Sequence, residues 1–338
     1  MTYQNIGVIG AGAWGTACAQ ALARAGRDVT IWALEPEVAD GINTARRNPV
    51  YLPDVELLPT LKATTDHADL GACEAVLAVA PAQFMRQTLA QFAPHARNGL
   101  PVVLCSKGIE VGSRSFMSEV LHDTLPDAVP AVLAGPSFAI DVAQGLPAAV
   151  TLACADDAVV ERLGASIRSD SFRPYLSGDV LGAEIGGAVK NVLAIACGMV
   201  LGLGLGRSAH AAVIARGFAE MRRLGVALGC EPETLTGLCG LGDLVLTCSS
   251  EQSRNMSCGL ALGRGTPLED ILGSRVAVTE GVATAPALRR MAQDAGVDMP
   301  ISDVVARIIA GELAVADAAR TLLTRELKRE AEDYAIAP

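Results

Sequence analysis

The chain has 338 residues, and this length predicts two domains instead of a single hydrophobic core. Hydrophobic residues make up 51% of the sequence and charged residues 19%, a balance that excludes an intrinsically disordered chain. The formal net charge is −10 and no long basic run occurs, so nucleic-acid binding is not expected. An acidic chain of this kind would bind an anionic ligand through a few placed cations and backbone N–H groups.

The nine cysteines stand singly, without a C-x-x-C pair, and most lie in apolar runs. We expect small buried side chains in a reducing compartment, with a zinc site or a thiol nucleophile as the weaker alternative. The N-terminus shows no signal-peptide pattern, and the most apolar stretch, 192–206, is glycine-rich and shorter than a bilayer span. We therefore expect a cytoplasmic protein without membrane insertion and without a metal.

The first half alternates short apolar runs with helix-length segments. Strands are predicted at 6–9, 29–32, 75–79, 102–105, 131–134 and 149–153, and helices at 14–25, 83–92, 113–122 and 157–168. Continuously apolar strands separated by helices indicate a parallel sheet covered on both faces. The predicted fold is a doubly wound, Rossmann-type α/β domain.

The second half carries only helical patterns. Helices are predicted at 179–200, 208–228, 254–262, 282–295 and 301–310, separated by glycines and prolines. We place the boundary between residues 177 and 190. The predicted domains are a dinucleotide-binding domain at 1–185 and an all-helical substrate and catalytic domain at 186–338.

A glycine-rich hexamer, Gly10 to Gly15, follows the first predicted strand and opens the first predicted helix. In a G-x-G-x-x-G turn, Gly10, Gly12 and Gly15 permit a tight turn, close approach of a pyrophosphate and close helix–strand packing. The helix N-terminus presents N–H groups to the phosphates. This context predicts dinucleotide binding.

The residues after the second predicted strand bear on coenzyme choice. An acid there accepts a hydrogen bond from the ribose 2′-hydroxyl of NAD, whereas a base meets the 2′-phosphate of NADP. Glu35 stands near that position, and residues 33–36 contain no cation. The alternative interpretation of Glu35, a solvated residue that starts a helix, is left open.

Polar residues follow two further predicted strands, where ligands bind in such sheets. Lys107 follows the strand at 102–105. Ser137, after Gly135, is predicted to expose a hydroxyl and an N–H group at a helix start. A lysine at the end of a strand, such as Lys107, either extends into solvent or binds a ligand, and both interpretations stay open.

The helical half contains three polar features in apolar surroundings. Lys190 interrupts a small, glycine-flanked, apolar helix, which favours a functional lysine over one that reaches solvent. Asp243 is a single acid in an apolar run and requires a partner. Ser253 is predicted to cap a helix whose first residues, Arg254 and Asn255, would meet a phosphate.

These motifs together resemble the bacterial-type NAD(P)-dependent glycerol-3-phosphate dehydrogenases over nearly the whole chain. The matching segments are GAGAWGTA from Gly10, SKG at 106–108, GPSFA at 135–139, GGAVKNV at 186–192, GLGDLVLTC at 240–248, QSRN at 252–255 and VTEG at 278–281.

The resemblance implies roles for residues at matching positions. Lys190 is implied as the catalytic proton acceptor, and Asp243 either orients it or holds a substrate hydroxyl. The implied substrate contacts are Lys107, Gly135, Ser137, Lys190, Asp243, Ser253, Arg254 and Asn255. The implied coenzyme contacts are Gly10, Gly12, Ala13, Trp14, Gly15, Leu34, Glu35, Lys107, Ala139, Arg254, Val278 and Glu280.

Two residues depart from the family pattern. Ala13 stands where many members have serine, and Leu34 stands where many have histidine or arginine, which removes a cation expected for NADP. The expected coenzyme is NAD or NADP, with NADH used at least as well as NADPH. The resemblance further implies a homodimer and a supply of glycerol 3-phosphate for glycerophospholipid synthesis.

The expected function is interconversion of sn-glycerol 3-phosphate and dihydroxyacetone phosphate. A hydride leaves C2 while the C2 hydroxyl loses its proton, so a lysine with a lowered pKa can act as the acid/base. Two alternatives remain at this stage: a dehydrogenase of similar architecture that acts on a hydroxy acid, and a nicotinamide-dependent sensor without catalysis.

Overall fold

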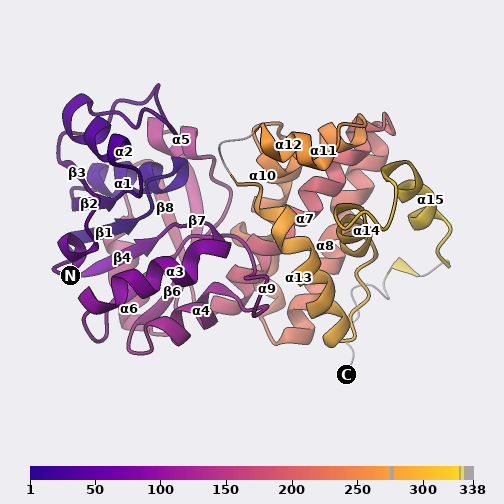
Figure 1. Cartoon of the computed structure of the whole chain (residues 1–338). Coiled ribbons are helices and arrows are strands. Elements are labelled where there is room, and N and C mark those ends of the chain that lie inside the picture. The colour runs from indigo at the N-terminus through magenta and orange to yellow at the C-terminus, as the bar shows by residue number, and fades with distance from the viewer. Residues whose placement is uncertain (275–277, 327–328, 331–338) are drawn as a thin grey trace. The chain divides into compact units, whose positions relative to one another are not determined.

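The structure, a computed structural model, describes residues 1–274, 278–326 and 329–330 (Figure 1). The chain divides into two compact units, Met1–Ser106 with Met117–Val180, and Lys107–Phe116 with Leu181–Pro338. The division falls ahead of the expected boundary at 185, and the end of the expected second domain, 331–338, lies outside the described residues. The segment Lys107–Phe116 belongs to the second unit because Ile109 and Phe116 are buried in that unit's hydrophobic core.

The first unit is built on one eight-stranded sheet with the order β3-β2-β1-β4-β5-β6-β7-β8. The first six strands in space have the doubly wound order of dinucleotide-binding domains. The strands are β1 Asn5–Ile9, β2 Asp28–Trp32, β3 Leu61–Thr64, β4 Ala75–Ala78, β5 Pro101–Leu104, β6 Val129–Ala134, β7 Ala148–Ala153 and β8 Phe172–Ser177.

The sheet is not wholly parallel, which corrects the sequence-based expectation. β6 and β7 pair antiparallel, with Leu133 opposite Leu152. The chain leaves β6, forms the short helix α5 (Ala139–Gln144) and turns back at the same end of the sheet. Every other strand pair is parallel.

Helices cover the apolar strands of this sheet. The α-helices of the first unit are α1 Ala13–Arg24, α2 Pro36–Asp40, α3 Ala82–Phe92, α4 Met117–Thr124, α5 and α6 Asp157–Ile167. α1 lies against α5, and α3 lies against α4. All four residues of β5 are buried, and its side chains alternate between the two faces, which explains the continuously apolar pattern.

The helix predicted at 113–122 begins at Met117 instead. The residues before it, 113–116, are not helical, and Arg114 adopts a left-handed conformation with φ 63°. That conformation is incompatible with a continuing right-handed helix.

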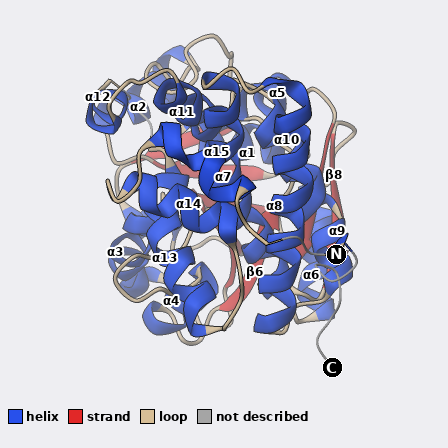
Figure 2. Ribbon diagram, turned by 90° about the vertical axis from the view of Figure 1, so that its right-hand side faces the viewer, coloured by secondary structure: helices blue, strands red, loops and turns tan. Residues whose placement is uncertain are grey.

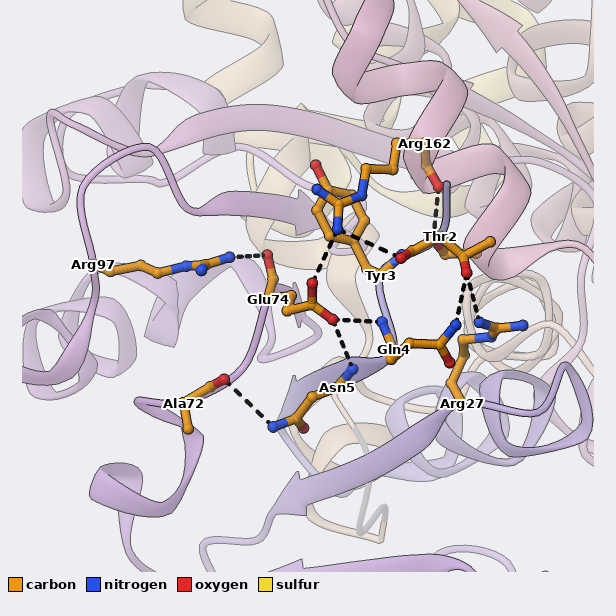
Figure 3. A network of polar contacts seen from close by, with 10 residues as sticks. Thr2, Tyr3, Gln4, Asn5, Arg27, Ala72, Glu74, Arg97 and Arg162 are labelled. Atoms are coloured by element: carbon orange, nitrogen blue, oxygen red, sulfur yellow. Dashed lines mark hydrogen bonds and ion pairs between the residues drawn. The ribbon is translucent and has the colours of Figure 1, made fainter.

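A polar network secures the N-terminus of the first unit (Figure 3). The Glu74 carboxylate accepts hydrogen bonds from the backbone N–H groups of Gln4 at 2.6 Å and Asn5 at 3.2 Å, and from Arg162 at 2.9 Å. The Arg162 guanidinium lies 3.8 Å from the ring centroid of Tyr3. These contacts tie the start of β1 to β4 and α6.

In the second unit, every regular element that the structure describes is helical (blue in Figure 2). The α-helices are α7 Val180–Gly202, α8 Gly206–Leu228, α9 Pro232–Thr236, α10 Asp243–Ser249, α11 Arg254–Gly263, α12 Leu268–Gly273, α13 Glu280–Asp294, α14 Pro300–Ile309 and α15 Ala318–Leu323.

The central helix α7 packs through glycines. A Cβ atom at Gly198 would lie 2.1 Å from the Met256 carbonyl oxygen of α11, and one at Gly259 of α11 would lie 2.0 Å from the Ile195 carbonyl oxygen. The two backbones can approach this closely only because these positions lack side chains.

α7 has 23 residues, so it is longer than the apolar stretch expected at 192–206. It is the one described helix that is long and apolar enough to cross a membrane, but 83% of its most apolar window is buried inside the protein. Burial of this extent is what a core helix of a globular unit shows.

Candidate active site

The glycine-rich turn has the geometry that a dinucleotide pyrophosphate requires. Gly10 has φ +108°, and a Cβ atom at Gly15 would lie 1.8 Å from the Gly10 carbonyl oxygen. Gly12 is the N-cap of α1, and a Cβ atom there would meet no protein atom within 4 Å, so the backbone is open to a ligand. Ala13 and Trp14 are the first two residues of α1, and the start of a helix directs backbone N–H groups toward a bound phosphate. These residues fit a nicotinamide dinucleotide.

The end of β2 lies directly beside this turn, because the Gly10 N–H group donates to the Trp32 carbonyl at 3.0 Å. Leu34 follows with 71% of its surface exposed and carries no polar group. Glu35 is the N-cap residue of α2, which agrees with the helix start in the alternative interpretation, but it is half-buried instead of solvated. Its carboxylate accepts a hydrogen bond from the Tyr51 hydroxyl at 2.9 Å.

The segment after β6 differs from the prediction in one respect. α5 begins at Ala139 with Phe138 as its N-cap, so Ser137 does not start the helix. The Ser137 hydroxyl donates to the Gly135 carbonyl at 2.9 Å. Gly135 has φ +149°, and a Cβ atom there would lie 2.8 Å from Cα of Val150.

In the second unit, Lys190 lies at the centre of a buried cluster. Its ammonium group donates to Asp243 Oδ1 at 2.7 Å and to the Thr247 hydroxyl at 2.8 Å. Asp243 Oδ2 accepts from the ammonium group of Lys107, also at 2.7 Å. The Lys190 and Asp243 side chains are 7% and 2% exposed, and that of Lys107 is 16% exposed. The partner that Asp243 requires is thus a pair of lysines.

Local backbone geometry brings these groups together. A π-helical turn, Leu238–Gly242, immediately precedes α10 and places Asp243 at its first residue. A Cβ atom at Gly186 would lie 2.5 Å from the Cys239 carbonyl oxygen, so α7 can cross this turn closely only with glycine at that position.

The cluster carries two ammonium groups and one carboxylate, a balance suited to an anionic substrate. Burial lowers the pKa of Lys190 to about 8, although the nearby Asp243 carboxylate acts to raise it. Burial alone would raise the pKa of Asp243, but Lys107 and Lys190 outweigh it and hold that pKa below 3.8. Lys190 can therefore exchange a proton near neutral pH while Asp243 stays ionised.

A chain of amides holds Lys107 in place. Asn191 donates to the Lys107 backbone carbonyl at 2.8 Å and accepts from Asn255 at 2.8 Å. The Asn255 side-chain oxygen in turn accepts from the Gly281 N–H group at 2.9 Å. One amide hydrogen and the side-chain oxygen of Asn255 are therefore used within the protein, and its backbone N–H group lies in the first turn of α11.

The predicted cap of α11 is confirmed. The Ser253 hydroxyl accepts from the Met256 N–H group at 3.2 Å, and Arg254 is the exposed first residue of the helix. Glu280 begins α13, close to the Asn255–Gly281 contact, and Val278 precedes it with 37% of its surface exposed.

Two residues that contact the lysines, Thr247 and Asn191, were not predicted as site residues. Thr247 lies one helical turn after Asp243 on α10, a spacing that could have drawn attention to it. Asn191 stands next to Lys190 in the sequence, but its side chain reaches Lys107 through a contact that spans 84 positions. No local pattern announces such a contact.

A doubly wound sheet with a glycine-rich turn, followed by a helical unit with a buried lysine–aspartate pair, defines a nicotinamide-dependent oxidoreductase. Family models described as NAD-dependent glycerol-3-phosphate dehydrogenase N-terminus and C-terminus match residues 5–160 and 179–320. The chain belongs to this family of NAD(P)-dependent enzymes.

Individual relatives agree over almost the whole length. The glycerol-3-phosphate dehydrogenase [NAD(P)+] of Maricaulis maris is 63% identical over 328 residues, which cover 97% of this chain and 98% of the relative. That of Caulobacter vibrioides is 60% identical over 331 residues, 98% of this chain and 100% of the relative. A crystal structure of glycerol-3-phosphate dehydrogenase from Coxiella burnetii matches with a TM-score of 0.91 at 38% identity, covering 96% of this chain and 99% of that one.

Proposed function

We propose that this chain interconverts sn-glycerol 3-phosphate and dihydroxyacetone phosphate with NAD or NADP, and that Lys190 is its general acid/base. Family membership supports the reaction. The observation that carries the role of Lys190 is a buried ammonium group, 2.7 Å from Asp243, whose pKa burial lowers to about 8. Groups with a pKa near the working pH are the efficient proton donors and acceptors.

Bound nicotinamide dinucleotide supplies or accepts the hydride at C2 of the substrate. In the direction of reduction, Lys190 as ammonium gives its proton to the C2 oxygen as negative charge develops there. In the direction of oxidation, Lys190 as neutral amine removes the proton of the C2 hydroxyl. Asp243 and Thr247 hold the Lys190 nitrogen through hydrogen bonds of 2.7 and 2.8 Å, so that its remaining valence faces one direction.

The substrate phosphate is assigned to the start of α11 and to Lys107. Arg254 supplies a guanidinium fork, the helix start supplies N–H groups, and Lys107 supplies a second positive charge. Gly135, Ser137 and Ser253 are proposed as further substrate contacts. The proposed coenzyme contacts are Gly10, Gly12, Ala13, Trp14, Gly15, Leu34, Glu35, Lys107, Ala139, Arg254, Val278 and Glu280.

The remaining expectations belong to the same proposal. The protein acts as a homodimer in the cytoplasm, without membrane insertion, and supplies glycerol 3-phosphate for glycerophospholipid synthesis. Burial of α7 inside the second unit supports the absence of a membrane span.

A steady-state assay of the purified chain tests the function. We expect oxidation of NADH or NADPH with dihydroxyacetone phosphate and little activity with 2-oxo acids. Turnover of a 2-oxo acid but not of dihydroxyacetone phosphate would assign the chain to hydroxy-acid dehydrogenases. Coenzyme binding without turnover of either substrate would indicate a sensor.

A further inference from the structure

A buried asparagine links the glycine-rich turn to the segment that follows α2. Asn48 is fully buried, and its side-chain amide donates to the Ala11 carbonyl and to the Thr16 hydroxyl, both at 2.8 Å. Its side-chain oxygen accepts from the N–H groups of Val50 at 3.2 Å and Tyr51 at 3.0 Å. All four hydrogen-bonding positions of this amide are used, so the backbone at Tyr51 has a defined position relative to the turn.

This anchoring sets the position of the Tyr51 side chain. Its ring is half-buried against the hydrophobic core of the first unit, and its hydroxyl donates to Glu35 Oε1 at 2.9 Å. Burial, and then the hydrogen bond to Glu35, raise the pKa of Tyr51 above 10.0, so the hydroxyl remains a donor at neutral pH. The second carboxylate oxygen of Glu35 keeps its capacity to accept.

Glu35 is the first acidic side chain after the end of β2, and β2 lies directly against the glycine-rich turn. In a doubly wound domain this is where the adenosine ribose lies. A carboxylate held there accepts well from a ribose 2′-hydroxyl and repels a 2′-phosphate.

We propose that Tyr51, anchored by Asn48, is a positioning residue for coenzyme selection: it aims the Glu35 carboxylate so that NAD is favoured over NADP. This inference rests on the proposed coenzyme site. It assigns the selection to a pair of residues, since Glu35 without Tyr51 would be a surface carboxylate with several accessible rotamers.

Two arginines, Arg46 and Arg47, precede Asn48 in the sequence and could meet a 2′-phosphate. Arg47 lies in the same segment, but its guanidinium donates to the Pro53 carbonyl at 2.9 Å. Arg46 is exposed and has a left-handed backbone conformation with φ 54°. Its backbone carbonyl accepts a hydrogen bond from the Leu57 N–H group at 2.8 Å. Arg46 is thus the cation whose removal must be compared with that of Glu35.

A double-mutant cycle tests the proposal, with wild type, Tyr51→Phe, Glu35→Gln and the double variant. The readouts are kcat/KM for NADH and NADPH with saturating dihydroxyacetone phosphate, and the Kd of each coenzyme from its fluorescence. Glu35→Gln should lower the NADH:NADPH preference about tenfold, and Tyr51→Phe should lower it at least about threefold, within the range of one truncated hydrogen bond. In the Glu35→Gln background, Tyr51→Phe should have no further effect.

Tyr175→Phe is the matched control, because this hydroxyl lies on the exposed edge strand β8 and should leave the preference unchanged. An unaltered preference in Tyr51→Phe, or effects of Tyr51→Phe and Glu35→Gln that simply add, would overturn the proposal. The proposal would also be overturned if Arg46→Gln changed the ratio of the NADH and NADPH Kd values more than Tyr51→Phe and Glu35→Gln do. The Kd ratio needs no substrate, so it still tests coenzyme selection if the chain fails to reduce dihydroxyacetone phosphate, which is the separate failure of the proposed function.

Discussion

At the scale of single residues, one buried carboxylate of the second unit is shared by two lysines. Asp243 contacts Lys190 through one oxygen and Lys107 through the other, both at 2.7 Å. Removing Asp243 would leave two buried or half-buried cations close together without a counter-charge, and such isolated charges are costly. Asp243 therefore supplies the counter-charge of the cluster and accepts a hydrogen bond from the Lys190 ammonium group.

The first prediction concerns proton transfer by Lys190. Lys190→Ala should lower kcat at least about 100-fold, the usual size of a general acid–base contribution, with little change in coenzyme Kd. In wild type, kcat/KM for reduction should fall as pH rises through about 8, because reduction requires the ammonium form, and kcat/KM for oxidation should rise over the same range. The variant should lack this titration. Near-full turnover by Lys190→Ala would show that another group is the acid/base.

The second prediction concerns the proposed contact between Arg254 and the substrate phosphate. Arg254→Ala should raise KM for dihydroxyacetone phosphate by a factor that corresponds to about 2–5 kcal/mol, the cost of truncating one partner of a desolvated charge pair. Unphosphorylated dihydroxyacetone, a poor substrate, should be hardly affected. Arg264→Ala, at the other end of α11, is the matched control. Equal losses on both substrates would contradict a role specific to the phosphate.

At the scale of elements, the contact between α7 and α11 depends on missing side chains. Gly259→Ala would place a Cβ atom 2.0 Å from the Ile195 carbonyl oxygen and force the helices apart. We expect the free energy of unfolding to fall by at least about 2 kcal/mol in a denaturant titration, as for an overpacked core. Gly273→Ala is the control, since a Cβ atom there meets nothing within 4 Å, and it should change stability by less than about 1 kcal/mol. Equal stabilities of the two variants would contradict the packing argument.

The network around Glu74 gives a pH-dependent prediction (Figure 3). The backbone hydrogen bonds from Gln4 and Asn5 lower the pKa of Glu74 below 4.5. A carboxyl whose pKa is lower in the folded state contributes stability above the unfolded pKa and loses it as pH falls through the folded pKa. Glu74→Gln should therefore cost about 1 kcal/mol at pH 7, and less as pH falls below 4.5. Thermal unfolding of wild type, Glu74→Gln and the exposed-site control Glu161→Gln measures this, and a cost independent of pH would argue against it.

The elements differ in how well the sequence predicts them. β1, β4 and β5 were predicted because nearly all of their residues are buried, which makes their patterns almost continuously apolar. β3 and β8 were missed because they lie at the two edges of the sheet, where half or more of their residues are not buried, and β8 contains Pro174.

The residues of the candidate site also differ in how well the sequence predicts them. Gly10, Lys190 and Asp243 can be recognised from the local sequence. Gly10 belongs to a glycine-rich turn, and Lys190 and Asp243 are charged residues in apolar segments. Asn48 and Tyr51 do not stand out, since their roles come from hydrogen bonds to Ala11 and Glu35 that only the folded chain creates. Local patterns thus single out candidate site residues such as Gly10, Lys190 and Asp243 better than residues whose contacts are distant in the sequence.

At the scale of the whole molecule, the net charge of −10 bears on the coenzyme. The 2′-phosphate of NADP adds nearly two negative charges, which an acidic protein tolerates only where a cation or several donors meet them. The residues that directly follow β2, 33–36, include the exposed Leu34 and the carboxylate of Glu35 and contain no cation.

We therefore expect NADH to be used at least as well as NADPH. The measurement is kcat/KM for both reduced coenzymes at one pH and one salt concentration, since screening weakens repulsion between exposed charges. NADH should also raise the thermal unfolding temperature of the whole chain at least as much as NADPH at equal concentration, because the ligand with the lower Kd stabilises the folded state more. A preference for NADPH above about tenfold, or 1.4 kcal/mol of differential transition-state binding, would contradict this expectation. It would direct attention to Arg46 and Arg47, the two exposed arginines that precede Asn48.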